Sequence, residues 1–110
     1  MKLIRCTVHP FQLDEVVDAL DSFDISNLTV TGAGERCRRN VTGVYRGGRY
    51  KIRLLPTSIV DITTADDQVD DIISTLTRLC SFGEQCNDNR ILVMPVNEWY
   101  TVRTRARNIA

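Results

Sequence analysis

The fold of this chain of 110 residues is decided by residues 2–20, KLIRCTVHPFQLDEVVDAL. Apolar and polar side chains alternate as far as Val8, which predicts a half-buried strand, and Pro10 ends it. The apolar residues then take the i, i+3, i+4 spacing of an amphipathic helix, with Asp14 and Glu15 placed to complement its N-terminal dipole. This stretch therefore predicts one strand followed by one helix.

The same pattern returns in residues 58–76, SIVDITTADDQVDDIISTL, with Thr64 as the expected N-cap of the second helix. Leu28 and Val30 mark a strand after the first helix, and residues 91–96 form a strand apolar enough to be expected in the centre of a sheet. Two βαβ units predict an α+β fold, a ferredoxin-like double βαβ sandwich with four antiparallel strands and two helices on one face. The other face is expected to be open, which favours self-association.

Charge is unevenly distributed along the chain, although 14 basic and 14 acidic residues give a formal net charge of zero. Most acidic residues gather on the two predicted helices. Residues 36–53 contain seven basic residues and no acidic one, and a second basic cluster lies at 103–107. Arginine forms bidentate contacts with phosphate and carboxylate groups, so an anionic partner is expected. The whole connection at 34–55 is longer than a hairpin requires, which indicates function or disorder.

The composition, with 43% hydrophobic and 25% charged residues, fits one globular domain. No apolar run approaches the roughly 18 residues of a membrane span, and the alternating start indicates a strand rather than a signal peptide. We therefore expect a cytoplasmic protein without membrane insertion. Four cysteines and one histidine lack metal-ligand spacing, so no metal site is expected. Cys80 and Cys86 flank a short loop and form a candidate redox pair, although a reducing cytosol favours the thiols.

Four segments of the chain resemble the PII family of signal-transduction proteins: HPFQLDEVVDAL at 9–20, ISNLTVT at 25–31, VYRGGRY with LLP within 44–56, and VRT at 102–104. The resemblance covers nearly the whole chain. It implies a non-enzymatic homotrimer that holds an adenine nucleotide in each cleft between subunits. Long, mobile T-loops beside these clefts change shape with the ligand and are read by a target protein.

The resemblance also implies how one PII-like domain over residues 1–110 is divided. Its parts are a T-loop at about 35–54, a phosphate-binding turn similar to the family's B-loop at about 81–90, and a C-terminal segment at about 97–110. The residues matched to nucleotide binding are Thr29, Gly32, Ala33, Gly34, Arg38, Thr63, Asn87, Asp88, Asn89, Arg90, Arg103 and Arg105. The residues matched to T-loop contacts with a partner or an anion are Arg36, Arg39, Tyr45, Arg46, Arg49 and Tyr50.

The chain departs from nitrogen-sensing members of the family at positions that those members use for ligands. They carry a glutamine at the T-loop base, where the corresponding region of this chain, residues 35–39, has none, and a lysine directly after LP, where this chain has Thr57. These differences argue against joint sensing of ATP, magnesium and 2-oxoglutarate, and they favour ADP or AMP. Tyr50 occupies a position that some relatives modify, but it lies in GGRY instead of GAEY, so modification is not expected.

Bicarbonate is a second candidate ligand, because a small planar anion suits an arginine fork with backbone amides at the loop base. Divergent PII-like proteins occur near inorganic-carbon machinery, including carboxysome-linked and bicarbonate-transporter-linked groups. The target protein is therefore expected to be a transporter, an enzyme or a carboxysome-related protein.

Three other functions stay open on the sequence. A nitrogen-regulatory PII protein that senses ATP and 2-oxoglutarate would share the fold. A nucleic-acid-binding module would explain the basic loop, but we expect no aromatic residues on the strands for base stacking, and the zero net charge argues against it. An enzyme would need a catalytic set, whereas His9 has no evident nucleophile nearby and Asp61 is expected to pair with a basic residue.

Overall fold

The computed structural model describes the backbone of residues 1–45, 48–80, 90–102 and 106–109, and the side chains of 1–36, 54–80 and 90–102. Its elements in chain order are β1 (Lys2–Val8), the 3-10 helix η1 (Pro10–Gln12), α1 (Leu13–Leu20), β2 (Ile25–Tyr45), β3 (Gly48–Thr64), the 3-10 helix η2 (Asp66–Gln68), α2 (Val69–Cys80), β4 (Ile91–Pro95), β5 (Glu98–Thr101) and β6 (Ala106–Ile109). The strands and helices predicted for the two βαβ units are present.

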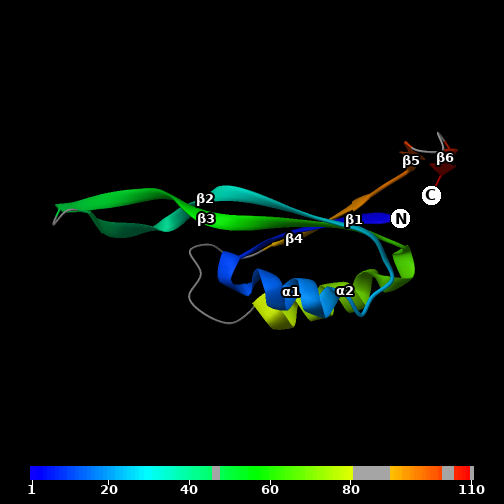
Figure 1. Ribbon diagram of the computed structural model, residues 1–110, viewed down its shortest axis with the longest axis horizontal. Coiled ribbons are helices and arrows are strands. Elements are labelled where there is room, and N and C mark those ends of the chain that lie inside the picture. Colours follow the sequence, from blue (N-terminus) through cyan, green and yellow to red (C-terminus); the bar gives the residue numbers. More distant parts are fainter. Residues whose placement is uncertain (46–47, 81–89, 103–105, 110) are drawn as a thin grey trace.

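The main sheet is antiparallel, with its four strands in the order β2-β3-β1-β4. Both helices cover the same face of this sheet, and no helix of the described residues lies over the other face (Figure 1). Two βαβ units wound in this way place their first strands, β1 and β3, side by side in the centre. The predicted ferredoxin-like α+β fold is therefore confirmed.

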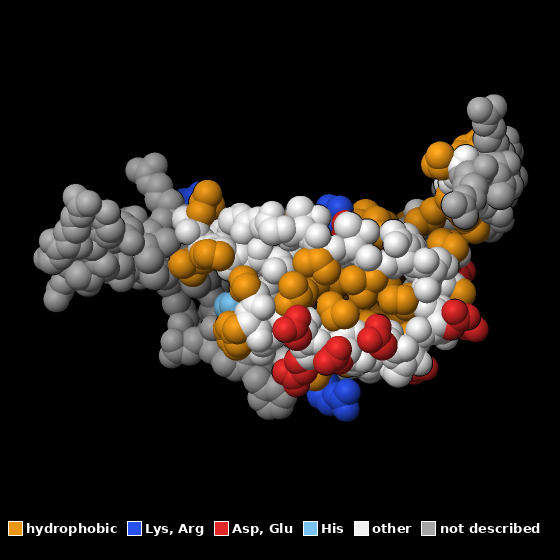
Figure 2. Space-filling view, in the orientation of Figure 1, with side chains coloured by type: hydrophobic (Ala, Val, Ile, Leu, Met, Phe, Trp, Pro, Cys, Tyr) orange, Lys and Arg blue, Asp and Glu red, His pale blue; other side chains and the backbone are white. Residues whose placement is uncertain are grey.

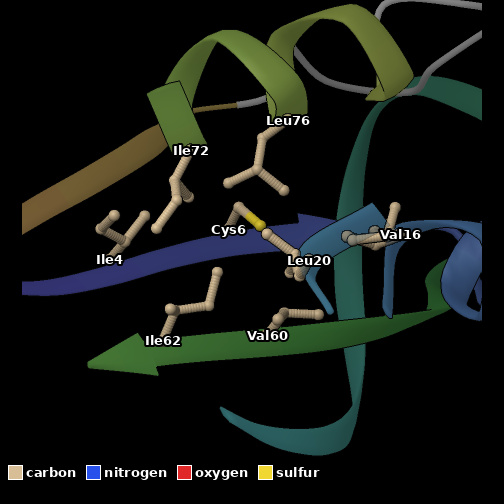
Figure 3. Packing of buried hydrophobic residues seen from close by; sticks show 9 residues of the cluster. Ile4, Cys6, Val16, Leu20, Val60, Ile62, Ile72 and Leu76 are labelled. Carbon is tan, nitrogen blue, oxygen red and sulfur yellow. The ribbon is translucent and has the colours of Figure 1, made fainter. Parts of the chain in front are cut away.

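The core lies between the sheet and the helices. Figure 3 shows side chains of β1 and β3 pointing toward side chains of α1 and α2. The buried hydrophobic residues are Ile4, Cys6, Val8, Val16, Leu20, Val60, Ile62, Ile72 and Leu76. They belong to the alternating and helical patterns that the sequence predicts, so the patterns identify the buried face of each element.

The position of β4 differs from the prediction, because β4 lies at an edge of the sheet and not in its centre. Among the described strands, β4 pairs with β1 alone. Ile91 packs against the core, whereas Leu92 and Val93 are 50% and 41% exposed. The apolar run at 91–96 therefore does not reflect burial on both faces.

Thr64 ends β3 and is not the helix cap that the sequence predicts. The residue before η2 is Ala65, which makes no side-chain cap, and α2 follows this turn. Strand alternation instead turns Thr64 toward the core with Ile62 and Val60, where it is fully buried. Its hydroxyl has no hydrogen-bond partner within the described side chains and backbone.

The side chain of Gln68 holds the turn before α2 against the turn after α1. Its Nε2 donates to the Asp24 carbonyl oxygen at 2.8 Å, and its Oε1 accepts from the Asp24 amide at 3.0 Å. In a Gln68→Glu variant a carboxylate oxygen would face that carbonyl, so we expect the free energy of unfolding to fall by about 1 kcal/mol. Urea denaturation at pH 7 measures this difference. An unchanged midpoint would show that the hydrogen bond to the Asp24 carbonyl oxygen contributes nothing to stability.

Cys6 makes the stability of the fold sensitive to high pH. Burial, with a smaller contribution from Cys80, raises the pKa of the Cys6 thiol to about 12. A thiol in the unfolded chain ionises near pH 8.5, so above that pH the unfolded chain releases a proton that the folded chain keeps. The unfolding free energy is therefore expected to fall by up to about 1.4 kcal/mol per pH unit above about pH 9. Urea denaturation at pH 8, 9 and 10 measures this loss.

The matched control for this pH dependence is Cys6→Val, which keeps an apolar side chain in the core but has no proton to lose. The difference in unfolding free energy between the two proteins should change with pH in the range where the thiol of the unfolded chain ionises. Parallel pH curves for the two proteins would contradict the prediction.

Two features of the strands go beyond the sequence predictions. β2 and β3 continue past the sheet as a paired ribbon through most of the connection expected to be a loop (Figure 1), with Val41 opposite Ile52 and Tyr45 opposite Gly48.

β5 and β6 form a separate two-stranded sheet. β5 carries Trp99, so the expectation of strands without aromatic residues is wrong. These strands have four residues each, too few for a clear alternation.

Candidate functional site

A polar corner lies at the β2 edge of the open sheet face and contains two candidate nucleotide residues. Thr29 pairs across the strands with Asp61, and Asn27 pairs with Thr63. The side-chain amide of Asn27 donates a hydrogen bond to Thr29 Oγ1 at 3.3 Å. Strand alternation places all four side chains on the face without helices. The structure thus brings Thr29 and Thr63 close together, with hydroxyl and amide groups able to bind a polar ligand.

The candidates Gly32, Ala33 and Gly34 continue β2 beyond this corner, opposite residues 56–58 of β3. A Cβ at Gly34 would lie 3.3 Å from Leu54 Cβ, so packing within the chain accounts for this glycine. A Cβ at Gly32 would meet no atom within 4 Å. When packing within the chain does not require a glycine in a strand, the glycine often marks a place where a ligand or another backbone approaches closely.

Thr57, which stands where the resemblance to nitrogen-sensing PII proteins would place a lysine, is directed at the backbone of β1. Its hydroxyl donates a hydrogen bond to the Val8 carbonyl oxygen at 3.3 Å. The side chain therefore contributes no positive charge at this end of the glycine segment.

Arg90 lies at the opposite edge of the sheet from these residues. It is exposed and directly precedes β4, whose first residue, Ile91, pairs with Cys6 of β1. β3 and β1 separate β4 from β2, and three strand spacings amount to roughly 14 Å. A single chain thus does not bring Arg90 to Thr29 and the glycine segment.

Most of the other candidates have side chains outside the described part of the chain. These are Arg38, Arg39, Tyr45, Arg46, Arg49, Tyr50, Cys86, Asn87, Asp88, Asn89, Arg103 and Arg105. Arg36 of β2 is described, and it is exposed at a position opposite Leu54. The roles assigned to these residues stay predictions. The same holds for the pairing of Cys80 with Cys86. Burial raises the pKa of the Cys80 thiol, which lowers its thiolate fraction and slows disulfide exchange near neutral pH.

The residues considered for catalysis are engaged in other contacts. The His9 ring stacks on Phe11 with ring centroids 5.2 Å apart. Asp61 accepts two hydrogen bonds from Arg5, at 2.8 Å from Nε and 3.0 Å from a terminal guanidinium nitrogen, so its predicted pairing with a basic residue is confirmed. Within the described residues, no group of three or more His, Cys, Asp or Glu side chains could hold a metal ion. No helix in the same part of the chain has the length and apolar character needed to cross a membrane.

Comparison with known proteins gives consistent matches along the chain. Residues 1–106 match the family model described as Nitrogen regulatory protein P-II. Nitrogen regulatory protein GlnK of Escherichia coli (strain K12) is 33% identical over 105 residues, which cover 94% of this chain and 93% of GlnK. Nitrogen regulatory protein P-II of Azospirillum brasilense is 34% identical, covering 94% and 93%. Nitrogen regulatory protein P-II 2 of Methanothermobacter thermautotrophicus is 33% identical, covering 94% and 90%.

Proposed function

Because the chain belongs to the family of nitrogen regulatory P-II proteins, we propose that it is a non-enzymatic, cytoplasmic homotrimer that binds an adenine nucleotide between its subunits. ADP or AMP is favoured over ATP. The T-loop, residues 35–54, passes the nucleotide state to a target protein, which is a transporter, an enzyme or a carboxysome-related protein.

The observation that carries this proposal is the separation of the candidate residues toward opposite edges of the sheet. Thr29, Thr63 and Gly32 lie at the β2 side, whereas Arg90 precedes β4 at the other side. A ligand that contacts both groups needs the β2 edge of one copy beside the β4 edge of another. Such a cleft would join hydroxyl groups and an open glycine from one subunit with a phosphate-binding arginine from its neighbour.

Thr57 supports the preference for a shorter nucleotide. A lysine there would supply a point charge for a distal phosphate, whereas the threonine hydroxyl is bonded to the Val8 carbonyl oxygen. Bicarbonate as a co-ligand is supported by the arginine-rich sequence of the T-loop base alone. The second candidate is a nitrogen-regulatory protein that senses ATP and 2-oxoglutarate, and its regulatory role is supported by relatives that are named nitrogen regulatory proteins.

Isothermal titration calorimetry with ATP, ADP and AMP, each with and without magnesium and 2-oxoglutarate, separates the two candidates. The proposal requires tighter binding of ADP or AMP, unchanged by 2-oxoglutarate, and a bicarbonate titration with saturating ADP would follow. Magnesium-dependent ATP binding that 2-oxoglutarate strengthens would establish the nitrogen-sensing function instead. Absence of heat with every nucleotide would overturn both.

A further inference from the structure

The hydrogen bond between Asn27 and Thr29 depends on a register shift at the start of β2. Ile25 and Leu28 both pack against the core, although strict alternation would turn residues three positions apart to opposite faces. The ladder between β2 and β3 shifts between Ile25 and Asn27 and then runs regularly as far as Arg36. The shift thus leaves Asn27 on the face without helices, on the same side of the strand as Thr29.

The direction of this hydrogen bond decides which polar atoms remain for a ligand. Asn27 Nδ2 donates to Thr29 Oγ1 at 3.3 Å, and neither side chain has another hydrogen bond within the described part of the chain. A hydroxyl whose oxygen accepts keeps its own proton for another acceptor, and an amide whose nitrogen donates keeps its carbonyl oxygen as an acceptor. Both residues are exposed. Thr29 therefore offers a donor and Asn27 an acceptor, side by side.

The charges near these two residues permit an anionic ligand. Asp61 lies opposite Thr29, and its carboxylate accepts two hydrogen bonds from Arg5, at 2.8 and 3.0 Å, which neutralise its charge. Acidic side chains gather instead over the helix layer (Figure 2), including Asp14 and Glu15 in the first turn of α1. That layer repels the phosphates of a nucleotide. Electrostatics therefore favour the open face for a nucleotide.

The donor and the acceptor of this pair match one edge of adenine. That edge carries the ring nitrogen N7, an acceptor, beside the 6-amino group, a donor. The Thr29 hydroxyl would donate to N7, and the Asn27 carbonyl oxygen would accept from the amino group. Guanine and hypoxanthine carry an oxygen beside N7, so the base then presents two acceptors. Turning the amide over does not restore the match, because the single Thr29 proton would then be drawn to the Asn27 oxygen and away from N7.

We propose that Asn27 selects adenine over 6-oxopurines in this chain, by accepting from the 6-amino group and by fixing the Thr29 hydroxyl as the donor to N7. The inference rests on the proposed adenine-nucleotide function and names the residue that decides which base is bound. Thr29 alone would not decide, because its hydroxyl rotates and can donate to N7 of any purine. Asn27 is therefore a specificity-determining residue, and through its amide it is also a positioning residue for Thr29.

The first test uses the wild-type protein and isothermal titration calorimetry with three nucleoside diphosphates. Inosine diphosphate has an oxygen in place of the amino group of ADP, and 7-deazaadenosine diphosphate has a carbon in place of N7. Each should bind about 10–100-fold more weakly than ADP, the range of one mismatched base contact. If ADP binds and either analogue binds within about threefold of it, this inference is overturned and the proposed function stands. A wild type that binds none of the three would overturn both.

The second test is the variant Asn27→Leu, which has a side chain of similar size but no amide. ADP should bind this variant about 10–100-fold more weakly, whereas inosine diphosphate should stay within about threefold of its wild-type affinity. The preference for ADP is then lost. Adding Thr29→Val to Asn27→Leu should weaken ADP binding less than Thr29→Val does in the wild type, because the two side chains act as one unit.

The matched control is Ser26→Ala, at the exposed residue beside Asn27 within the register shift. Its affinities for ADP and inosine diphosphate should both stay within about threefold of the wild type. Because Asn27 and Thr29 are exposed, their variants are expected to fold, and circular dichroism checks this. Equal losses of affinity for ADP and inosine diphosphate in Asn27→Leu would mean that Asn27 only maintains the shape of the strand, and would overturn the inference.

Discussion

Replacing Gly32 by valine is expected to weaken adenine-nucleotide binding by about 100-fold or more while the chain remains folded. The backbone at this position does not have the left-handed conformation that requires glycine, and a Cβ would meet no atom of its own chain within 4 Å. A β-branched side chain also suits a strand better than glycine does, by roughly 0.5–1 kcal/mol. The fold should therefore tolerate the change, whereas a ligand lying against the glycine would be displaced.

Calorimetry with ADP and thermal unfolding, both at fixed protein concentration, measure the two effects of Gly32→Val separately. Gly34→Ala is the comparison for stability, because a side chain there would meet its own chain. Its Cβ would lie 3.3 Å from Leu54 Cβ, so stability should fall by about 1 kcal/mol or more and recover in part when Leu54→Ala is added. Nucleotide affinity that is unchanged in Gly32→Val would mean that no ligand approaches residue 32. Sedimentation of the variant shows whether assembly, rather than the ligand contact, has been lost.

Replacing Leu76 by alanine is expected to lower the free energy of unfolding by about 2–5 kcal/mol, a large part of the roughly 5–15 kcal/mol typical of a domain. Leu76 is fully buried, and Figure 3 shows it beside Cys6 and Leu20 in the layer between sheet and helices. The substitution would leave a cavity where the two βαβ units meet. Because the surrounding side chains are closely packed, they could not move far enough to fill it. Urea denaturation followed by circular dichroism gives the difference.

The control for this substitution is Leu79→Ala on the same helix, because Leu79 is only partly buried against the core. Its loss should be clearly smaller. Both variants must be compared with the wild type at one protein concentration, since association contributes to the measured stability. Equal losses for the two leucines would contradict the described packing of α2.

The sequence predicts the double βαβ fold because its core residues occur at two regular spacings. Ile4 and Cys6 of β1 alternate with exposed or partly exposed residues, and Ile72 and Leu76 of α2 recur at helical spacing, so periodicity alone identifies their buried faces. Periodicity does not report which neighbour a strand has. The apolar run that begins at Ile91 therefore suggests a central strand although β4 lies at an edge.

The candidate site is only partly predictable for a related reason. The resemblance to PII proteins locates Thr29, Gly32 and Thr63, and the structure adds that Thr29 and Thr63 share the face without helices with Asn27, while Gly32 lies further along β2. No local pattern indicates that Arg90 lies across the sheet, because strand order is a property of the whole fold. The contact of Gln68 with Asp24 also spans 44 positions, so it has no local signal in the sequence.

The ribbon formed by β2 and β3 has the mechanical form of a lever. One arm is the part of the two strands from Ile25 to Arg36 with its partner strand, and the other arm is the paired segment from Val41 to Tyr45 with its partner strand. The register shift between Arg36 and Val41 interrupts the ladder between the two arms and can serve as the fulcrum. Gly32 and Gly34 lie just on the sheet side of this point. A displacement of the backbone by a ligand there would be transmitted across this point to the paired segment from Val41 to Tyr45.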